Sequence, residues 1–537
     1  MASELEGTSI IGYSRGVARG EKLQGYNPAT GEKLGPLYYS ASDEKINHAA
    51  KLAEKAFESY SRMSGREKGI FLRRIAANIE GIGEPLVIRA VQETGLAPAR
   101  IQSETGRTCH QLRMFAELVE EGSWVDARID VADPNRKPAS KPDVRSMYRP
   151  IGPVAVFCAS NFPLAFSVAG GDTASALAAG NPVIINAHYS HPGTAELVGT
   201  AIREAALSCS LPDGVFSLLY GAGYGVGQKL VRHPLVKAVG FTGSRRGGLA
   251  LMQIAASRPE PIPVFAEMSS INPVFILPRA IKDRCDEIAA GLYGSVTLGA
   301  GQFCTNPGLV VLKEDEESRK FSSKLGDMMK QSGTFTMLNP GISLAYSRAV
   351  AEREKSAYVR TFPHQHSEVL AERCQASAAL FHVDARTFLT HPDLNEEVFG
   401  PSTLLVTHTS REELLEIARH LEGHLTATIH GTEDEIREHR DLIAILEKKV
   451  GRIVYNGFPT GVEVCHAIVH GGPFPATSDG RSTSVGTGAI YRFARPVCYQ
   501  NFPNSELPDE LKNENPRGIS RLVDGMLTRD SVVNRHQ

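Results

Sequence analysis

The sequence predicts an α/β protein with two domains, each built around a mainly parallel sheet. Short apolar segments of β type recur roughly every 20 to 30 residues from residue 154 to residue 267, with helix-like patterns between them. A second series runs from residue 274 to residue 456. Strands that alternate with helices form parallel sheets. The segments are nearly continuous in apolar residues, as expected for strands covered on both faces.

The first part of the chain is predicted to be helical. Ser42 suits a helix N-cap, and the apolar residues of segment 46–57 fall on one helical face. Amphipathic helices are also expected over residues 67–79 and 100–121. Residues 131–147 are polar and contain three prolines, which indicates a connector or an extended arm.

Two sets of strands follow this helical region. The first set is expected at residues 154–157, 183–186, 215–220, 236–241 and 263–267. The second set is expected at residues 274–277, 309–312, 403–407, 426–430 and 452–456. The domain boundary therefore falls near residue 270, and the polar segment after residue 496 shows little periodicity.

The composition restricts the class of protein. With 537 residues, 42% of them hydrophobic, the chain is long enough for two or more domains, and 50 Gly and 31 Pro exclude a collagen-like or disordered chain. The net charge of −2 gives no basic surplus that would attract a nucleic acid.

Neither export nor membrane insertion is expected. The first ten residues are acidic and lack the apolar core of a signal peptide. The most apolar stretch, residues 163–180, is interrupted by polar residues and predicts a buried helix instead of a membrane span. The eight cysteines are widely spaced, which predicts neither a zinc knuckle nor a disulfide framework and favours a reducing, cytoplasmic location.

Three polar residues stand at or just beyond predicted strand ends, where open α/β sheets bind ligands. Cys304 lies in the glycine-rich segment LGAGQFCTNPG (298–308), Glu267 ends a strand, and Asn161 follows one. Each residue also has a structural interpretation: a buried thiol, a carboxylate that caps a turn, and a turn amide.

A phosphate-binding turn is predicted at FTGSRRGG (241–248), which follows a strand and precedes a helix. The segment 220–228 reads GxGxGxG and is interpreted as a flexible loop. A metal site is not expected, because the paired histidines lie in loops without nearby carboxylates and are expected to face solvent. These pairs are His188 and His191, His364 and His366, and His466 and His470.

Taken together, the motifs resemble the aldehyde dehydrogenase superfamily. The segments that carry the resemblance, in order, are NFPL (161–164), FTGS (241–244), EMSSINP (267–273), GQFCT (301–305) and EEVFGP (396–401). The likeness extends over roughly residues 20 to 500, and the finer detail resembles the branch of 2-oxoglutarate-semialdehyde (2,5-dioxovalerate) dehydrogenases. The same branch contains NADP-dependent fatty-aldehyde dehydrogenases.

The resemblance implies an enzyme that oxidises an aldehyde to a carboxylic acid. Cys304 is then the nucleophile that forms a thiohemiacetal and, after hydride transfer, a thioester. The side-chain amide of Asn161 and the backbone N–H of Cys304 form the oxyanion hole. Glu267 is the general base that activates water for hydrolysis of the thioester.

The resemblance also implies a site for NAD or NADP. Gly243, Ser244 and Gly248 belong to the turn at the pyrophosphate, while Glu397 holds the nicotinamide ribose and Phe399 packs near the ring. Asn186 stands where relatives usually have a lysine that bonds the adenosine ribose or its 2′-phosphate.

The implied architecture has a cofactor domain, a catalytic domain and a small sheet that bridges subunits. We expect a homodimer or homotetramer with a small-molecule aldehyde as substrate and no membrane or nucleic-acid partner. The expected ranges are 1–130 and 148–268 for the cofactor domain, 269–470 for the catalytic domain, 131–147 and 485–500 for the bridging segments, and 501–537 for the C-terminal tail.

Three questions stay open at the level of sequence. Asn186 brings no charge, so the preference between NAD and NADP depends on whether Arg245 or Arg246 compensates. An anionic substrate requires a basic residue, for which Arg452 is one candidate. The alternative substrate is a medium- or long-chain fatty aldehyde. The alternative reaction is acyl transfer to coenzyme A, which the presence of Glu267 disfavours. The alternative to an enzyme is a non-catalytic binding protein with the same fold.

Overall fold

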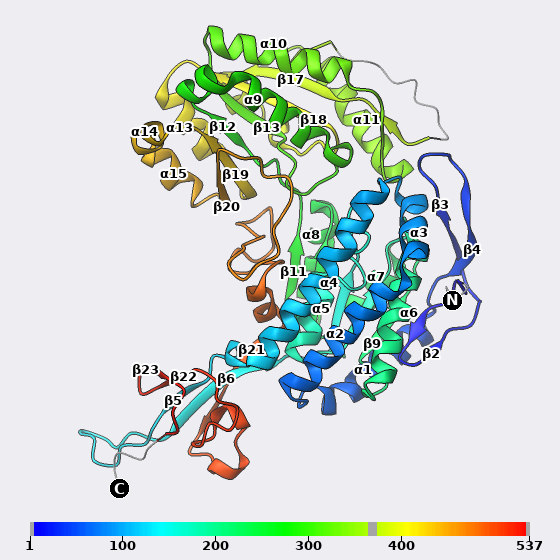
Figure 1. Cartoon of the computed structure of the whole chain (residues 1–537), viewed down its shortest axis with the longest axis vertical. Helices are drawn as coiled ribbons and strands as arrows, with labels where there is room; N and C mark the ends of the chain where they lie inside the picture. Colours follow the sequence, from blue (N-terminus) through cyan, green and yellow to red (C-terminus); the bar gives the residue numbers. More distant parts are fainter. Residues whose placement is uncertain (1–4, 364–372, 533–537) are drawn as a thin grey trace.

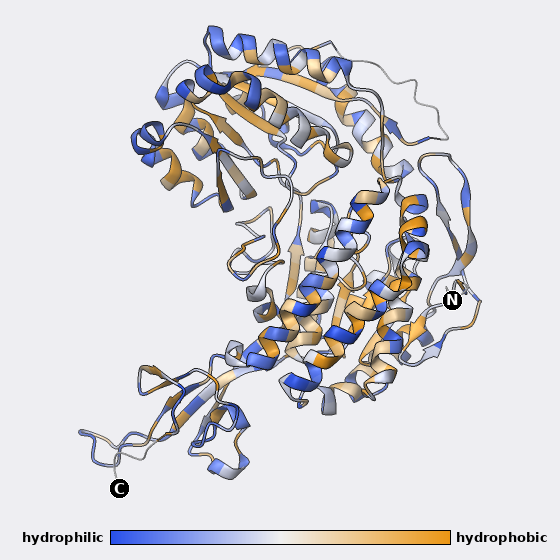
Figure 2. Cartoon of the chain, in the orientation of Figure 1, coloured by the Kyte–Doolittle hydropathy of each residue, from blue (hydrophilic) through white to orange (hydrophobic). Residues whose placement is uncertain are grey.

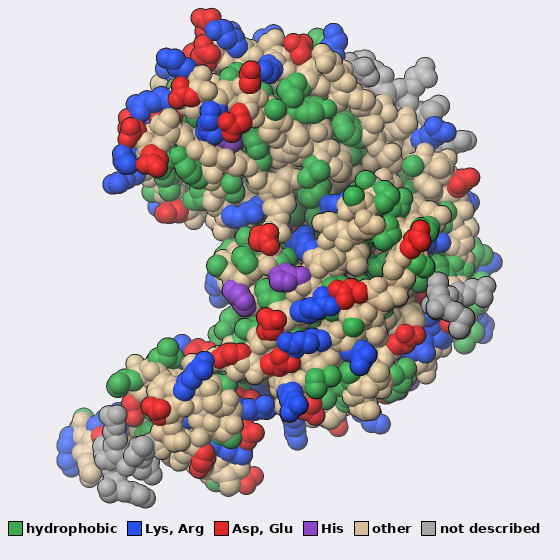
Figure 3. Space-filling view, in the orientation of Figure 1, with side chains coloured by type: hydrophobic (Ala, Val, Ile, Leu, Met, Phe, Trp, Pro, Cys, Tyr) green, Lys and Arg blue, Asp and Glu red, His purple; other side chains and the backbone are tan. Residues whose placement is uncertain are grey.

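The computed structural model describes residues 5–363 and 373–532. It has two large α/β lobes and a narrow arm, and the chain enters the arm twice, first with residues 128–150 and again with its C-terminal part (Figure 1). The surface is hollowed between the upper lobe and the arm (Figure 3). The predicted α/β fold class is confirmed.

The first lobe contains a sheet with the strand order β11-β10-β7-β8-β9-β1-β2. The five strands from β7 to β11 pair in parallel, and each lies within two residues of its expected position. The strands are Ile10–Ile11 (β1), Ser14–Arg15 (β2), Val154–Phe157 (β7), Val183–Asn186 (β8), Phe216–Leu219 (β9), Ala238–Thr242 (β10) and Val264–Glu267 (β11).

Both faces of this sheet are buried. Val183 and Ile185 belong to one apolar cluster, whereas Ile184 between them belongs to another, as the alternation of strand side chains requires. Hydrophobic residues concentrate on these strands, and the covering helices turn polar faces outward (Figure 2). The helices are Asp43–Tyr60 (α1), Gly65–Ile82 (α2), Glu84–Thr94 (α3), Pro98–Glu121 (α4), Gly171–Ala179 (α5), Pro192–Ser208 (α6), Gly225–Arg232 (α7) and Arg245–Ala256 (α8).

The second lobe contains a sheet with the order β15-β17-β18-β13-β12-β19-β20, parallel except for β15. Its strands are Val274–Ile276 (β12), Leu309–Lys313 (β13), Arg360–Thr361 (β15), Ala379–Asp384 (β17), Ser402–His408 (β18), His424–His430 (β19) and Val450–Tyr455 (β20). Its helices are Pro278–Thr297 (α9), Glu316–Gln331 (α10), Pro340–Lys355 (α11), Ala385–Thr390 (α12), Arg411–His420 (α13), Glu433–Glu438 (α14) and Arg440–Leu446 (α15).

The arm is a sheet with the order β21-β6-β5-β22-β23. Its strands are Arg128–Asp130 (β5), Val144–Pro150 (β6), Ala494–Gln500 (β21), Arg521–Val523 (β22) and Met526–Thr528 (β23). The C-terminal segment therefore adds two strands, although its sequence pattern shows none. Strands of three residues are too short to show a recognisable alternation.

Smaller elements complete the chain. Two short pairings join Lys22–Tyr26 (β3) to Lys33–Tyr39 (β4) and Phe335–Thr336 (β14) to Gln375–Ala376 (β16). Short 3₁₀ segments lie at Ser123–Val125, Leu298–Gly301, Pro392–Asn395, Thr487–Phe493, Asn504–Glu506 and Asp509–Leu511. Within the described ranges, no helix has the length and apolar character needed to cross a membrane.

Two local expectations need correction. The buried helix expected over 163–180 is confined to α5, because residues 161–170 form turns that lead from β7 to the helix. The segment 220–228 is a loop only up to Tyr224, after which α7 begins at Gly225. Both segments are rich in glycine, which adopts turn and helical conformations with similar ease, so the sequence pattern alone could not tell loop from helix.

Asn181 ties the first sheet to the arm. Its Oδ1 accepts hydrogen bonds from the backbone N–H groups of Ile151 and Gly152, each at 2.9 Å. Its Nδ2 donates to the carbonyls of Phe493, at 2.9 Å, and Ala176, at 3.2 Å. The side chain is fully buried, so no water can replace these bonds without rearrangement.

Asn181→Ala is predicted to destabilise the protein by at least about 2 kcal/mol, because two buried N–H donors lose their acceptor. A melting temperature lowered by several degrees in a thermal-shift assay would agree with this. Asn135→Ala, in an exposed loop of the arm, serves as the control and should leave the melting temperature unchanged. Equal melting temperatures for the two variants would contradict the role of Asn181.

Candidate functional site

The sheet of the first lobe brings the predicted residues to one edge. β7, β10 and β11 are neighbours in parallel register, so their carboxyl ends lie side by side. Asn161 follows β7, Gly243 follows β10 and Glu267 ends β11. The backbone N–H of Gly243 donates to the Glu267 carbonyl at 3.0 Å. The site thus lies where open α/β sheets place their ligands.

A tightly curled loop presents Cys304 to this edge. Gly299, Ala300 and Gly301 have φ angles of 56°, 59° and 66°, a left-handed run that is unfavourable for the alanine. A Cβ on Gly301 would lie 2.2 Å from the carbonyl oxygen of Gly400, so only glycine allows the two backbones to pack this closely. The curl turns the chain between α9 and Cys304.

Cys304, His470 and Glu267 form a contact cluster. His470 Nε2 lies 3.4 Å from Cys304 Sγ and 2.9 Å from Glu267 Oε1, while the hydroxyl of Ser484 donates to Glu267 Oε2 at 2.6 Å. His470 and Glu267 are almost completely buried, and Cys304 is partly exposed. The thiol and the carboxylate meet at the same imidazole nitrogen, and the ligand atoms of the three groups lie within 4.8 Å of one another, so a nucleophile and a base are close together.

The expectation that His470 faces solvent is wrong. The residue precedes two glycines in a loop without helical or strand periodicity, and its partner Glu267 is remote in sequence, so no local pattern marks it. His191 is also buried, with Nε2 bonded to the Ala159 carbonyl at 2.9 Å. His466 is exposed as expected. His364 and His366 lie outside the described residues.

The cluster sets the protonation of its members. Burial, followed by the charge and hydrogen bond of Glu267, raises the pKa of the Cys304 thiol well above its usual range. Burial alone would raise the pKa of Glu267 too, but contacts with His470, Ser484 and Cys304 bring it below its usual value. The resting state therefore pairs a neutral thiol with a charged carboxylate.

The three groups also offer ligand atoms within 4.8 Å of one another, a spacing that a metal ion could use. The absence of a functional metal site stays a prediction. Asn161 lies beside the same loop, since its Nδ2 donates to the carbonyl of Gln302 at 3.0 Å. Its amide is thus directed at the segment that carries Cys304.

The predicted phosphate turn caps a helix. Ser244 is the N-cap of α8 and accepts a hydrogen bond from the Gly247 N–H at 3.2 Å. Gly243 and Ser244 are exposed, so the start of the helix is open to a ligand. Gly248 is buried, and a Cβ there would lie 2.5 Å from Met268 Sδ, so the glycine lets α8 pack closely on the end of β11.

Asn186, Arg245 and Arg246 differ in the contacts that they make. Asn186 ends β8, and its buried Oδ1 has no hydrogen-bond partner among the described residues. Arg245 is paired with Glu422 at 2.9 Å, and Arg246 is exposed. Buried acceptors nearly always receive a hydrogen bond, so we expect a ligand or water to donate one to this Oδ1.

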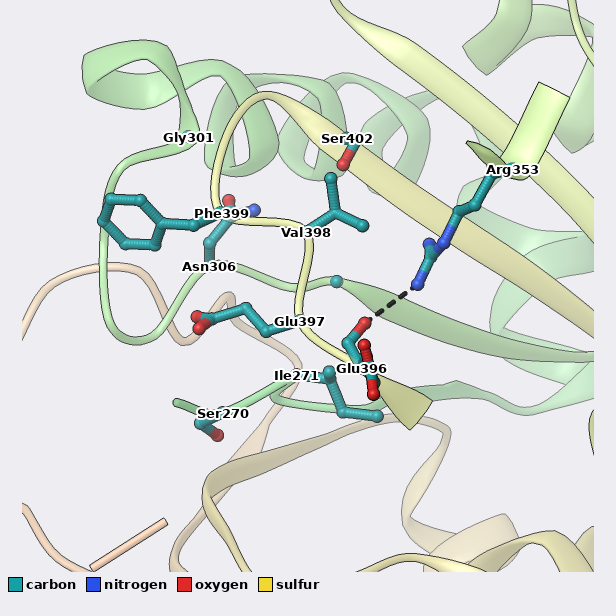
Figure 4. A pocket seen from close by; sticks show the side chains of 11 residues that line it. Ser270, Ile271, Gly301, Asn306, Arg353, Glu396, Glu397, Val398, Phe399 and Ser402 are labelled. Atoms are coloured by element: carbon teal, nitrogen blue, oxygen red, sulfur yellow. Dashed lines mark hydrogen bonds between the residues drawn. The ribbon is translucent and has the colours of Figure 1, made fainter. Parts of the chain in front are cut away.

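Glu397 and Phe399 line a pocket together with residues that flank Cys304 in the sequence (Figure 4). Gly301 and Asn306 of that loop belong to the same lining, and Arg353 holds the segment by donating to the Glu396 carbonyl at 2.9 Å. Burial raises the pKa of Glu397 to about 7, against hydrogen bonds from Ser269 and Ser270. The pocket therefore contains a carboxyl group that titrates near neutral pH.

Comparisons with known proteins agree with these features. The model of the Aldehyde dehydrogenase family matches residues 17–473. "Alpha-ketoglutaric semialdehyde dehydrogenase 2" of Azospirillum brasilense is 48% identical over 97% of this chain and 99% of its own. "Alpha-ketoglutaric semialdehyde dehydrogenase" of Acinetobacter baylyi is 44% identical over 98% of this chain and 100% of its own.

Solved structures show the same fold. Gamma-glutamyl-gamma-aminobutyraldehyde dehydrogenase from Burkholderia cenocepacia superimposes with a TM-score of 0.79 at 20% identity, over 93% of this chain and 97% of its own. The resemblance noted from the sequence motifs is therefore confirmed for the family and for the fold.

Glu267→Gln is predicted to lower the pKa of the Cys304 thiol, because it removes the negative charge that disfavours the thiolate. The rate of alkylation of Cys304 by iodoacetamide should then reach its plateau at a lower pH than in the wild type, as followed by peptide mass spectrometry. Glu422→Gln, which removes an exposed carboxylate, is the control. A profile unchanged or shifted upward in Glu267→Gln would contradict the prediction.

Proposed function

The chain belongs to the aldehyde dehydrogenase family, and we propose that it oxidises 2-oxoglutarate semialdehyde to 2-oxoglutarate, with Cys304 as the nucleophile and NAD or NADP as the oxidant. The contact of one imidazole nitrogen with both the Cys304 thiol and Glu267 carries the chemical proposal. The names of the two relatives, whose substrate is the same compound, support the choice of aldehyde. They do not favour the alternative of a fatty aldehyde.

Activation of Cys304 requires removal of its proton, since the resting group is the thiol. His470 Nδ1 is buried without a hydrogen-bond partner among the described residues, so the imidazole proton belongs on Nε2, where Glu267 accepts it. As the sulfur attacks the aldehyde carbon, the thiol proton passes to Glu267, with which the thiol shares a hydrogen bond, while the Nε2 proton stays on His470 and holds the carboxylate in place. The product is a thiohemiacetal on Cys304.

Asn161 stabilises the oxygen of this adduct. One hydrogen of its amide is engaged with the Gln302 carbonyl, and the second is free to meet a negative oxygen next to Cys304. The backbone N–H of Cys304 supplies the other donor. Loss of one such donor typically lowers the rate by about 10²–10³.

The residues that would hold the cofactor fit a dinucleotide. Gly243 and Ser244 at the open start of α8 suit the pyrophosphate, the orphan Oδ1 of Asn186 suits a ribose hydroxyl, and Glu397 with Phe399 suits the nicotinamide riboside. The cofactor, when bound, supplies the acceptor for the hydride that leaves the substrate carbon.

Glu267 acts again after the thioester has formed. Its Oε2 is held by Ser484, which leaves Oε1 directed at His470 and Cys304. A carboxylate in this position can accept a proton from water that attacks the thioester. The acid is released, and the Cys304 thiol is restored.

The arm supports a proposal on assembly. Met526 and Leu527 are neighbours on the edge strand β23 and are 64% and 76% exposed, so this edge of the arm presents apolar side chains beside backbone groups that another strand could pair with. We propose that the arm pairs with another subunit in a homodimer or homotetramer, and that the enzyme acts in the cytoplasm.

Rapid mixing of enzyme, cofactor and 2-oxoglutarate semialdehyde tests the proposed function. The wild type should turn over, and Cys304→Ala should form no reduced cofactor while still binding NAD or NADP. Glu267→Gln should give a burst followed by slow turnover, because the lower pKa of its Cys304 thiol still supplies the thiolate for the first step. Absorbance of the reduced cofactor and mass spectrometry of the acyl-enzyme report the two stages. Turnover above a few per cent in Cys304→Ala would remove Cys304 from the mechanism.

Asn186→Lys is predicted to raise kcat/KM with NADP more than with NAD. A lysine adds a charged hydrogen bond to the 2′-phosphate, worth about 1.5–3 kcal/mol, whereas a ribose hydroxyl gains less. The wild type should discriminate only weakly between NAD and NADP, or favour NAD, because Arg245 is already paired with Glu422 and is not free to bind the 2′-phosphate. A wild type that favours NADP by a hundredfold would show that other residues hold the phosphate.

A further inference from the structure

Two arginines of α4 lie on an aromatic cluster beside the reactive loop. The Arg100 guanidinium lies 4.3 Å from the ring centre of Phe162 and 4.8 Å from that of Phe303. The Arg107 guanidinium lies 5.6 Å from Phe162 and 5.3 Å from Phe166. The rings form a wall that is almost wholly buried and supports both cations from one side.

The two arginines differ in their partners. Arg100 forms a 3.1 Å ion pair with Glu104, the carboxylate that also accepts the backbone N–H groups of Leu164 and Ala165. Arg107 forms no ion pair with any described residue, and its buried Nε and Nη2 have no hydrogen-bond partner there. The Arg107 side chain is only partly buried, but two unsatisfied nitrogens out of contact with water are costly, which points to a ligand as their partner.

Arg107 lies close to the reacting groups. The ring of Phe166, which it contacts, is 5.9 Å from the ring of His470, and Phe303 in the same aromatic cluster directly precedes Cys304. Burial lowers the pKa of Arg107, while the charges of Glu104, Cys304 and Glu267 act in the opposite direction. The guanidinium is therefore within electrostatic reach of the thiol.

We propose that Arg107 binds the carboxylate of the aldehyde substrate and thereby selects an anionic semialdehyde. The inference rests on the proposed function and names the residue that would give it its specificity. The substrate carries its carboxylate at the end opposite the aldehyde, so one end can reach Cys304 while the other meets the guanidinium. Nε and Nη2 have no partner among the described residues and lie on the edge of the guanidinium that matches the two oxygens of a carboxylate. Both atoms are closed to solvent, so the substrate reaches them only when the side chains that cover them move aside.

Arg452, the candidate named from the sequence, is engaged elsewhere. Its Nη2 donates to the Pro459 carbonyl at 2.6 Å, and Nη1 and Nη2 both donate to the Gly461 carbonyl at 3.2 Å. These bonds hold the loop after β20 and occupy the terminal nitrogens. In Arg107, by contrast, Nε and Nη2 have no hydrogen-bond partner among the described residues.

Arg107→Met tests the proposal, because methionine keeps the apolar contact with the rings and removes the charge. With 2-oxoglutarate semialdehyde, kcat/KM should fall about 10- to 100-fold, mainly through KM. With pentanal, a neutral aldehyde of the same chain length, kcat/KM should stay within about twofold of the wild-type value. The inhibition constant of 2-oxopentanoate, which has a methyl group in place of the aldehyde, should rise in parallel with the KM of the semialdehyde.

Arg113→Met is the matched control, since Arg113 lies on the same helix in an exposed pair with Glu80. It should leave both substrates unaffected. An equal loss on both aldehydes, or no loss on either, would overturn the role of Arg107. If Arg107→Met does not fold, Arg107→Lys provides the test: a selective loss on the semialdehyde supports the proposal, and unchanged kinetics overturn it. A wild type that oxidises pentanal but not the semialdehyde would instead refute the proposed function.

Discussion

The fully buried side chain of Asn272 fixes the reactive loop against the segment that carries the carboxylate. Asn272 lies in the crossover from β11 to β12, so it stands between the two sheets and five residues after Glu267. Its Nδ2 donates to the carbonyls of Cys304 and Asn306, each at 2.9 Å, and its Oδ1 accepts from Thr426 of the second sheet at 3.1 Å. Its φ of 46° is one that asparagine adopts more readily than most residues. One amide therefore sets the position of the thiol relative to its base.

This arrangement explains how a buried site can hold a nucleophile and a carboxylate together. Two negative groups at such short distance would repel strongly in a region of low dielectric constant. The chain avoids this by keeping the Cys304 thiol neutral and by placing His470 and Ser484 on the oxygens of Glu267. The thiolate is then needed only while the sulfur attacks the substrate, and at other times the neutral thiol is less prone to oxidation.

Most strands of the two large sheets could be predicted because buried parallel strands consist of continuous apolar residues, as in residues 154–157 and 183–186. Glu267 could be found because it ends a strand, and Cys304 because it lies in a glycine-rich segment that matches a family motif. His470 could not, because its role depends on a loop that only the folded chain brings to Glu267. The strands β22 and β23 and the unpaired state of Arg107 likewise depend on tertiary neighbours and leave no local pattern.

The Cys304 loop also couples the pocket lined by Glu397 and Phe399 to the reactive thiol. The close contact of Gly301 with Gly400 joins this loop to the segment of Glu397 and Phe399, so one turn of backbone lines the pocket and presents the thiol. A ligand that shifts the Glu397 segment must displace Gly301, because two backbones at van der Waals contact cannot move independently. The geometry of the nucleophile is thus tied to the occupancy of the pocket through backbone packing alone.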